Sequence, residues 1–109
     1  MIEEHPNGVR TRPAADADRD RIYQLVETLT GTTPTPAWDI VYDAHLSADR
    51  GAIVVAENDD GILGCATVSY NVALRYGGEY CELEELIVAE SARGLNLGRI
   101  LVQRTIDDA

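Results

Sequence analysis

Apolar residues in the first half of the chain recur with the period of an α-helix in two segments. The first begins at Asp16 and places four apolar residues on one helix face, at Ile22, Leu25, Val26 and Leu29. The second follows Thr35, a residue type favoured as an N-cap, and has Pro36 at its first helical position. Its apolar face would consist of Trp38, Val41, Tyr42, His45 and Leu46. We therefore expect two helices, which end at Gly31 and at residues 50–51.

Other segments have the pattern or composition of β-strands. Residues 9–13 alternate apolar and charged side chains, and residues 52–57 form the β-branched run of a strand buried on both faces. Asp60 and Gly61 lie between two β-prone runs, which predicts a hairpin whose return strand covers residues 62–72. The segment before the first strand is expected to fray.

Charged residues are unusually frequent in a fourth predicted strand, residues 80–88. Strict alternation would place Cys81, Leu83, Glu85 and Ile87 on one side of this strand, and Glu82, Glu84, Leu86 and Val88 on the other. A helix over residues 99–108 follows, so that the predicted order of elements is β-α-α-β-β-β-α. No internal repeat or domain boundary interrupts it, and we expect a single domain over residues 1–109.

Composition indicates a globular protein that does not bind nucleic acid. The 109 residues are 45% hydrophobic, and 19 acidic residues outweigh nine basic ones, all of them arginine, for a net charge of −10. Nucleic-acid affinity depends on Lys and Arg, so neutral or cationic small molecules suit an acidic chain better. No stretch is apolar enough to span a membrane, and the acidic N-terminus differs from a signal peptide. A cytoplasmic protein without membrane or nucleic-acid partners is expected.

The two cysteines, Cys65 and Cys81, are too few for a disulfide framework and lack the spacing of metal ligands. We expect both to be small buried or half-buried thiols, and we predict no metal site. The glutamates around Cys81 disfavour its thiolate, so this residue should be a poor nucleophile and a covalent acyl-enzyme is not expected.

The second predicted helix carries side chains with two interpretations. A histidine on an apolar stripe, such as His45, is expected to be packed and hydrogen-bonded rather than catalytic. The helical spacing of Trp38 and Tyr42 likewise favours core packing. The alternative is that these three residues line a substrate pocket.

Acids and bases are segregated in the last third of the chain. Residues 79–90 contain five acids and no base, whereas residues 91–106 contain no acid and three arginines, Arg93, Arg99 and Arg104. Gly94 and Gly98 flank the start of the predicted helix, where unpaired N–H groups and the helix dipole favour anions. Together these features predict a phosphate-binding loop, although glycines at such turns are also common for packing alone.

Two familiar phosphate-binding loops do not fit. A nucleoside-triphosphatase loop requires Gly-Lys followed by Ser or Thr, but Gly98 is followed by Arg99 and Ile100, and the chain has no lysine. A dinucleotide fingerprint needs an acidic residue about 20 positions after its glycines. The chain extends only 11 residues beyond Gly98.

The segment Leu83–Val88, a short loop and the segment Arg93–Leu101 resemble the acyl-CoA signature of the GNAT N-acetyltransferases. The earlier elements and the Asp60-Gly61 hairpin also lie where that family has them, so the resemblance covers residues 9–108. It implies an α+β fold with a mixed, largely antiparallel sheet flanked by helices. It also implies an acyl-CoA-dependent N-acyltransferase with acetyl-CoA as cosubstrate.

The resemblance implies which residues bind the cosubstrate. Backbone groups of the signature strand would hydrogen-bond the pantetheine arm, at Leu86, Ile87 and Val88. Backbone amides of the following loop would wrap the pyrophosphate, at Arg93, Gly94, Leu95, Asn96, Leu97, Gly98 and Arg99. Asn96 replaces a glycine of the family's loop. Asn tolerates a positive φ and its amide can donate to a phosphate oxygen, but its side chain can also crowd the pyrophosphate.

The family also implies catalytic candidates. Glu84 occupies the position of a carboxylate that deprotonates the acceptor amine, and Glu82 is the second candidate. Like charges on one strand face make a carboxylate a better proton acceptor; the alternative is a solvated face or ion pairs with Arg75. A backbone N–H near residues 86–88 would stabilise the thioester oxygen. Packing is the expected role of three candidate proton donors, Tyr70, Tyr76 and Tyr80.

Family members continue beyond this helix with further strands and a helix, so the domain is expected to be truncated after the coenzyme-loop helix. The strand 80–88 would then have an open edge, which predicts a partner chain, a homodimer with exchanged strands or a truncated chain. Three hypotheses result. The protein acetylates a small-molecule or peptidyl primary amine by direct attack; it is a noncatalytic GNAT-like binding module; or it is an inactive fragment that needs its missing C-terminal half.

Overall fold

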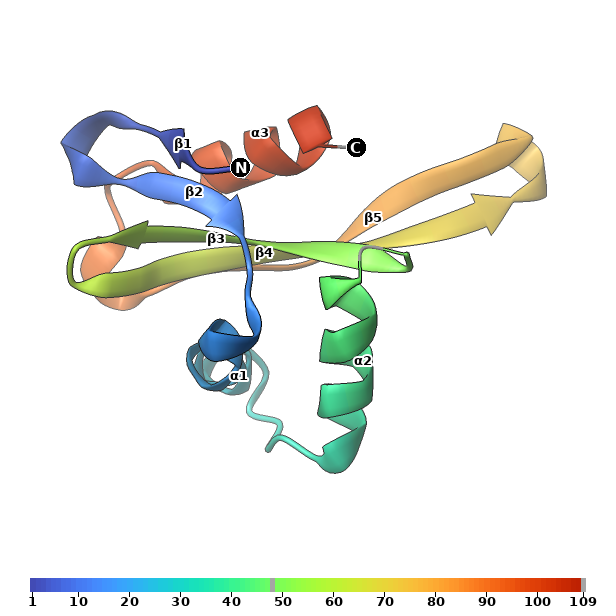
Figure 1. Ribbon diagram of the computed structural model, residues 1–109, viewed down its shortest axis with the longest axis horizontal. Coiled ribbons are helices and arrows are strands. Elements are labelled where there is room, and N and C mark those ends of the chain that lie inside the picture. The colour runs from blue at the N-terminus through green and yellow to red at the C-terminus, as the bar shows by residue number, and fades with distance from the viewer. Residues whose placement is uncertain (48, 109) are drawn as a thin grey trace.

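The computed structural model describes residues 1–47 and 49–108. Five strands form one antiparallel sheet in the order β1-β2-β3-β4-β5 (Figure 1). Their bounds are β1 (Glu3–Glu4), β2 (Arg10–Pro13), β3 (Gly51–Asn58), β4 (Gly61–Ala73) and β5 (Gly78–Val88). The α-helices are α1 (Arg19–Thr30), α2 (Pro36–Leu46) and α3 (Leu97–Asp108). Among the described residues, no helix has the length and apolar character that a membrane crossing requires.

The predicted α+β class and the order β-α-α-β-β-β-α are confirmed, with one strand added at the N-terminus. In β1, Glu3 and Glu4 pair with Thr11 and Arg10 of β2. His5 Nε2 shares a hydrogen bond of 3.0 Å with Thr11 Oγ1. The expectation that this segment frays is therefore wrong, because a two-residue strand without a periodic pattern leaves no signal in the sequence.

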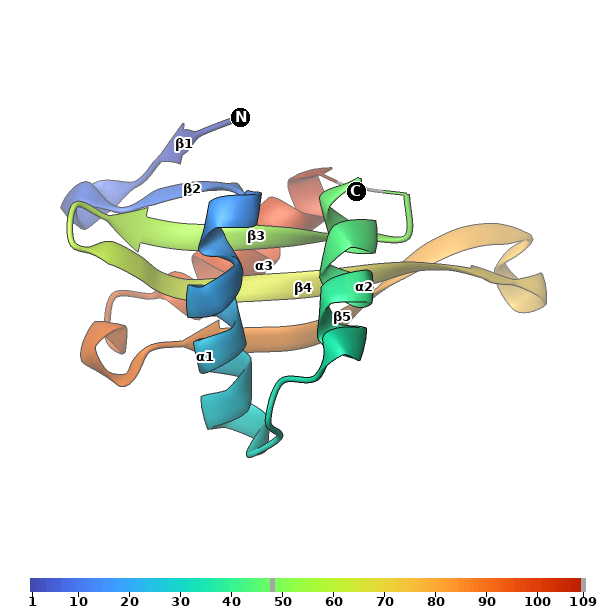
Figure 2. The ribbon, with the colours of Figure 1, turned by 60° about the horizontal axis from the view of Figure 1, so that its bottom comes forward.

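Helices cover both faces of the sheet. Helices α1 and α2 lie on one face and run across the strands, and α3 lies on the opposite face (Figures 1 and 2). Alternate residues of β3 fill the two cores. Val54 and Ala56 pack with Leu97 and Leu101 of α3, whereas Ile53 and Val55 belong to the cluster that contains Ile22, Leu25 and Tyr42. The prediction of a strand buried on both faces is thus confirmed.

The predicted helix boundaries have different physical causes. Gly31 follows α1 in the left-handed conformation, with a φ of 72°, and its N–H donates to the Glu27 carbonyl. Pro36 begins α2 after an extended Thr35, but the Thr35 side chain makes no capping hydrogen bond. The fixed φ of proline, rather than a side-chain cap, therefore marks the start of α2.

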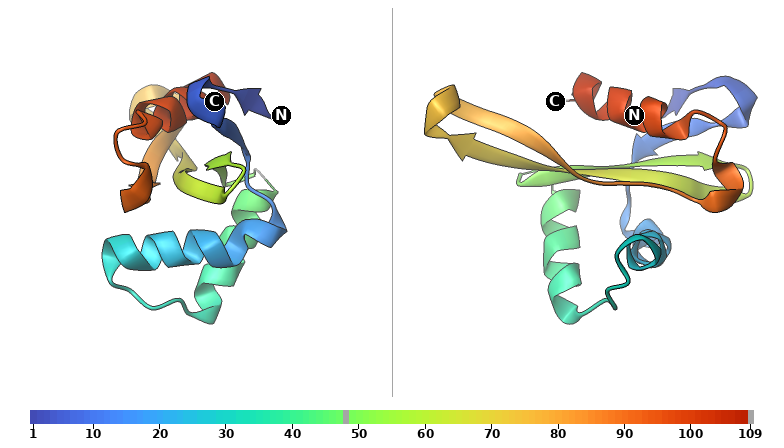
Figure 3. Two further views of the ribbon diagram at one scale, coloured as in Figure 1. Left: turned by 90° about the vertical axis from the view of Figure 1, so that its left-hand side faces the viewer. Right: turned by 180° about the vertical axis from the view of Figure 1, so that it is seen from behind.

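The β4–β5 hairpin extends as an arm beyond the helices (Figure 3). Near its tip the Arg75 guanidinium lies 4.7 Å from the ring centre of Tyr76 and 5.4 Å from that of Tyr80. The two rings pack 5.0 Å apart. The packing role predicted for these tyrosines is confirmed, and within the described residues Arg75 contacts the rings and forms no ion pair with the strand's glutamates.

Candidate active site

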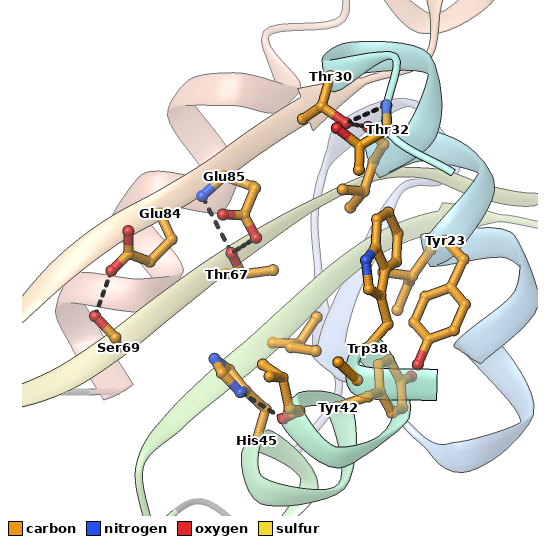
Figure 4. Close-up of a pocket in the computed structure, with 15 residues that line it drawn as sticks. Tyr23, Thr30, Thr32, Trp38, Tyr42, His45, Thr67, Ser69, Glu84 and Glu85 are labelled. Atoms are coloured by element: carbon orange, nitrogen blue, oxygen red, sulfur yellow. Dashed lines mark hydrogen bonds between the residues drawn. The ribbon is translucent and has the colours of Figure 1, made fainter. Parts of the chain in front are cut away.

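A pocket of about 540 Å³ lies between the helices α1 and α2 and the sheet (Figure 4). The helical side contributes Ile22, Tyr23, Val26, Thr30, Thr32, Ala37, Trp38, Val41, Tyr42 and His45. The sheet contributes Ile53, Thr67, Ser69, Glu84 and Glu85. The volume suits a small molecule. One wall is mainly apolar and aromatic, and the opposite wall carries two carboxylates.

A β-bulge brings both carboxylates to this pocket. Thr67 of β4 pairs with Glu85, but the next residue, Val68, pairs with Leu83, so Glu84 is the extra residue of the bulge. Two residues of a bulged strand oppose one residue of the partner, which interrupts the alternation of side chains. Glu84 and Glu85 therefore share a face. The predicted strict alternation, which separated them, is wrong at this point.

Hydroxyl groups of β4 hold the two carboxylates. Ser69 Oγ donates to Glu84 Oε2 at 2.6 Å and accepts from Asn71 Nδ2 at 2.9 Å. Thr67 Oγ1 donates to Glu85 Oε1 at 2.7 Å and accepts the Glu85 N–H at 3.1 Å. Each hydroxyl oxygen accepts one N–H group and gives its single proton to a carboxylate. Both carboxylates are therefore acceptors in these hydrogen bonds. Within the described residues, the second oxygen of each carboxylate has no hydrogen bond.

The other candidate catalytic residues lie elsewhere. Glu82 is exposed, and its carboxylate accepts a hydrogen bond of 3.3 Å from the Tyr80 hydroxyl. Tyr70 is half-buried, and this burial raises the pKa of its hydroxyl. Neither Glu82 nor any of the candidate tyrosines is among the described residues that line the pocket. The structure thus brings Glu84 to the pocket, and the catalytic roles remain predictions.

Aromatic rings form the wall opposite the carboxylates. The Tyr23 ring packs edge-on against Trp38, with 5.2 Å between ring centres, and against Tyr42 at 5.7 Å. The Tyr23 hydroxyl donates to Asp39 and the Tyr42 hydroxyl donates to the Ala15 carbonyl, each at 2.7 Å. Burial raises the pKa of both phenols to about 12. Tyr42 has the predicted core packing, Trp38 is half-buried, and both residues also line the pocket.

His45 is hydrogen-bonded, as predicted, and it also lines the pocket. Its Nδ1 lies 2.8 Å from the Val41 carbonyl. Because a carbonyl oxygen accepts, Nδ1 is the donor of this hydrogen bond. The ring packs over Gly51, where an added Cβ would lie only 2.7 Å from Nε2. Glycine at this position leaves room for the imidazole.

Two residues of the loop between β5 and α3 have positive backbone φ angles. Gly94 and Asn96 have φ values of 97° and 62°. The tolerance of Asn96 for a positive φ is thus confirmed. Helix α3 begins at Leu97, and the Ile100 N–H donates to the Asn96 carbonyl at 3.3 Å. The N–H groups that precede Ile100 in the helix have no intrahelical acceptor and are available to a phosphate.

The side chains of this region divide between solvent and core. Arg93 and Arg99 are exposed, as expected for an anion site. Leu97 is only 2% exposed, so it contributes its backbone alone. Arg104 is 5% exposed and donates to Thr11 Oγ1 and to the Thr11 carbonyl. The expectation of three arginines at the anion site is therefore wrong: Arg104 connects α3 to β2.

The predicted pantetheine-binding strand forms the edge of the sheet. Ile87 packs in the core under α1 and α2, and Val88 packs against the core under α3. Leu86 is 37% exposed, Leu95 is 36% exposed, and Gly98 lies near the Leu86 side chain. No strand pairs with the outer side of β5 within residues 1–47 and 49–108. Its outward backbone groups are thus open to an extended ligand.

The two cysteines differ. Cys65 is buried, and burial raises the pKa of its thiol to about 12. Cys81 is exposed on β5, so the expectation of a buried or half-buried thiol is wrong there. Cys81 lies in the exposed, charge-rich part of this strand.

Comparison with known families decides what kind of protein carries this site. The model of a family described as acetyltransferase (GNAT) family matches residues 19–109. The chain belongs to the GNAT acetyltransferase family. Membership confirms the resemblance and makes the protein an acyl-CoA-dependent N-acetyltransferase by class. The search of curated proteins found no match.

Solved structures share the fold. A putative acetyltransferase from Agrobacterium tumefaciens str. C58 is 25% identical with a TM-score of 0.75, over 91% of this chain and 72% of its own. Glucosamine-6-phosphate N-acetyltransferase from Arabidopsis thaliana is 23% identical with a TM-score of 0.74, over the same shares of the two chains. AAC(6')-Iy, solved with the bisubstrate analog CoA-S-monomethyl-acetylneamine, is 20% identical with a TM-score of 0.76, over 91% of this chain and 69% of its own.

Part of this GNAT chain's pocket has only a weak signal in the sequence. Thr67 and Ser69 are alternate hydroxyl residues in a mostly apolar strand, which is a usable signal for a polar patch on one face. Glu85 was assigned to the wrong face because the bulge has no signature in the residue types. Tyr23 directly follows Ile22 but is not part of the predicted apolar stripe of α1.

Proposed function

We propose that this chain transfers the acetyl group of acetyl-CoA to a primary amine by direct attack, with Glu84 as the general base. The proposal is carried by one juxtaposition: Glu84 faces the pocket, and the same strand leads into the anion-binding loop. The four residue steps from Glu84 to Val88 span about 13 Å of extended strand. An extended arm that follows β5 from the loop would therefore bring its end to the pocket.

The loop would bind the cosubstrate through charge and free N–H groups. Arg93 and Arg99 are exposed cations in a chain of net charge −10; Arg93 lies in the loop and Arg99 in the first turn of α3. The positive end of the helix dipole adds to their attraction for a pyrophosphate. A backbone N–H near residues 86–88 would then stabilise the thioester oxygen as it becomes negative.

Glu84 would remove the proton that prevents attack. Its Oε2 is held by Ser69, which leaves Oε1 to accept a proton from the ammonium group. The neutral amine then attacks the thioester carbonyl; a C–N bond forms and the C–S bond breaks, and the departing CoA thiolate takes the second proton of the nitrogen to leave as the thiol. The exposed position of Cys81 outside the pocket fits this direct route.

The open edge of β5 favours a second candidate, a noncatalytic module that binds acyl-CoA or a partner's strand. The two functions differ in turnover. Mass spectrometry of mixtures of the chain, acetyl-CoA and a panel of primary amines would detect acetylated product. Acetyl-CoA binding without product from any amine would support the module and contradict the enzyme.

The Glu84→Gln variant tests the catalytic role. Loss of the base should lower kcat by about 10²- to 10³-fold, with acetyl-CoA affinity unchanged and part of the rate recovered at high pH. Glu79→Gln removes an exposed carboxylate of the same strand outside the pocket and is the matched control. An unchanged kcat in Glu84→Gln would rule out this residue as the base.

A further inference from the structure

The residues that line the pocket also indicate the chemistry of the part of the acceptor that does not react. This inference rests on the proposed function, which places the acceptor's amine beside Glu84. Figure 4 shows Glu84 and Glu85 on one side of the pocket and Trp38 and His45 on the other. The two sides offer very different chemistry to a ligand.

The carboxylate side suits a cation. Glu84 and Glu85 each accept one hydrogen bond from a β4 hydroxyl, and each keeps one oxygen without a partner among the described residues. None of the described residues that line the pocket is an arginine. An ammonium group would therefore meet two carboxylates, whereas a phosphate or carboxylate on the acceptor would meet repulsion without a compensating cation.

The helical side suits an apolar body. Trp38, Val41 and Val26 line it, and Ile22 and Ile53 extend the same apolar surface. The Trp38 ring is fixed edge-on against Tyr23, so this wall is preorganised rather than formed by free side chains. Contact with such a wall is favourable for carbon and unfavourable for hydroxyl groups.

The polar atoms on the helical side are largely occupied. The Tyr23 hydroxyl donates to Asp39, and the Tyr42 hydroxyl donates to the Ala15 carbonyl. Two further donors bond backbone carbonyls of their own helices, Thr30 Oγ1 with Val26 and His45 Nδ1 with Val41. A ligand with several hydroxyl groups would lose its hydrogen bonds to water and find few replacements here.

We propose that the acceptor is a primary amine on an apolar carbon body, an arylalkylamine or alkylamine, and not an amino sugar. The ammonium group lies between Glu84 and Glu85, and the body packs against Trp38. The solved glucosamine-6-phosphate N-acetyltransferase, which shares the fold at 23% identity, thus differs from this chain in acceptor class.

The test compares three amines by binding and by turnover. 2-Phenylethylamine, hexylamine and glucosamine are titrated into the chain with saturating CoA, and their acetylation by acetyl-CoA is followed by mass spectrometry. Both apolar amines should exceed glucosamine at least about tenfold in affinity and in kcat/KM. Equal or tighter binding of glucosamine would overturn the inference while leaving the acetyltransferase proposal intact. Selective binding of the apolar amines without product would support the inference on the acceptor and contradict the acetyltransferase proposal.

Two variants locate the interactions. Trp38→Ala should weaken 2-phenylethylamine binding about tenfold and change ethylamine binding little, because only the larger amine reaches that wall. Glu85→Gln should weaken both amines, because the ammonium group is common to them. Ile40→Ala, on an exposed position of α2 outside the pocket, is the control. Unchanged 2-phenylethylamine binding in a folded Trp38→Ala variant would contradict the placement.

Discussion

At the scale of single residues, the side chains around the pocket depend on small neighbours for their positions. Gly51 is the clearest case, because an added Cβ would collide with the Val68 carbonyl and approach His45 Nε2 to 2.7 Å. His45 is in turn fixed to the Val41 carbonyl at 2.8 Å. Gly51 therefore influences the shape of the pocket without lining it.

We expect Gly51→Ala to lower the free energy of unfolding by about 1–3 kcal/mol, because a buried methyl must displace the imidazole or the strand. Amine kcat/KM should fall as well, since His45 lines the pocket. Urea denaturation and steady-state kinetics measure the two effects. Gly78→Ala is the matched control, since a Cβ there meets nothing within 4 Å. Equal stability of both variants would contradict the close contact at Gly51.

At the scale of elements, the half-buried Arg12 and the buried Arg104 connect segments that are distant in sequence. Arg12 of β2 donates to Asp18 at 2.7 and 3.0 Å and to Glu57 of β3 at 2.7 and 3.0 Å. Hydrogen bonds from this guanidinium hold the pKa values of both carboxyl groups below their usual range. Asp18 also accepts the Ala15 N–H at 2.7 Å and so fixes the entry into α1.

This network predicts how stability depends on pH. Carboxyl groups with a lowered pKa in the folded chain contribute stability above their unfolded pKa, near about 4, and lose it as the pH falls through the folded value. Arg12→Met should lower the unfolding free energy at neutral pH by about 3 kcal/mol and flatten its decline in acid. Denaturation across the acid range measures this. A variant curve parallel to that of wild type would contradict the network.

The two arginines of α3 separate stability from cosubstrate binding. Arg104 is buried and donates to Thr11 and Asp108, whereas Arg99 is exposed beside the predicted anion-binding loop. Arg104→Met should lower the unfolding free energy by about 1–3 kcal/mol, because carbonyl groups lose a charged donor. Arg99→Met should leave stability unchanged and weaken acetyl-CoA binding. Thermal denaturation with and without acetyl-CoA distinguishes them, and the opposite pattern would contradict both assignments.

Features that depend on a few neighbouring residues can be predicted from the sequence. Features that depend on contacts between distant segments cannot. The Asp60-Gly61 hairpin, the end of α1 at Gly31 and the positive φ of Asn96 each depend on a few neighbouring residues, and the structure confirms them. The bulge at Glu84 depends instead on the register with β4. The burial of Arg104 depends on where α3 meets β2. Neither the register nor that contact can be read from residue types.

At the scale of the whole molecule, β5 is an open edge that invites pairing. Leu83 is 45% exposed on this strand, and the outer backbone groups have no strand partner within the described ranges. We expect self-association through this edge and a monomer for Leu83→Lys, because a charge on an edge strand opposes pairing. Light scattering over a concentration series measures the mass. A wild-type monomer throughout would contradict this expectation.

The central claim, that the loop after β5 binds acetyl-CoA, is tested most directly by a thermal-shift titration of the chain beside its Arg93→Glu variant. At 100 times Kd, a bound ligand adds about 2.7 kcal/mol of stability, or roughly 10 °C in Tm for a domain of this size. The account predicts a saturable rise in Tm that is lost in the variant. A folded wild-type chain without a rise, or an equal rise in both proteins, would contradict it.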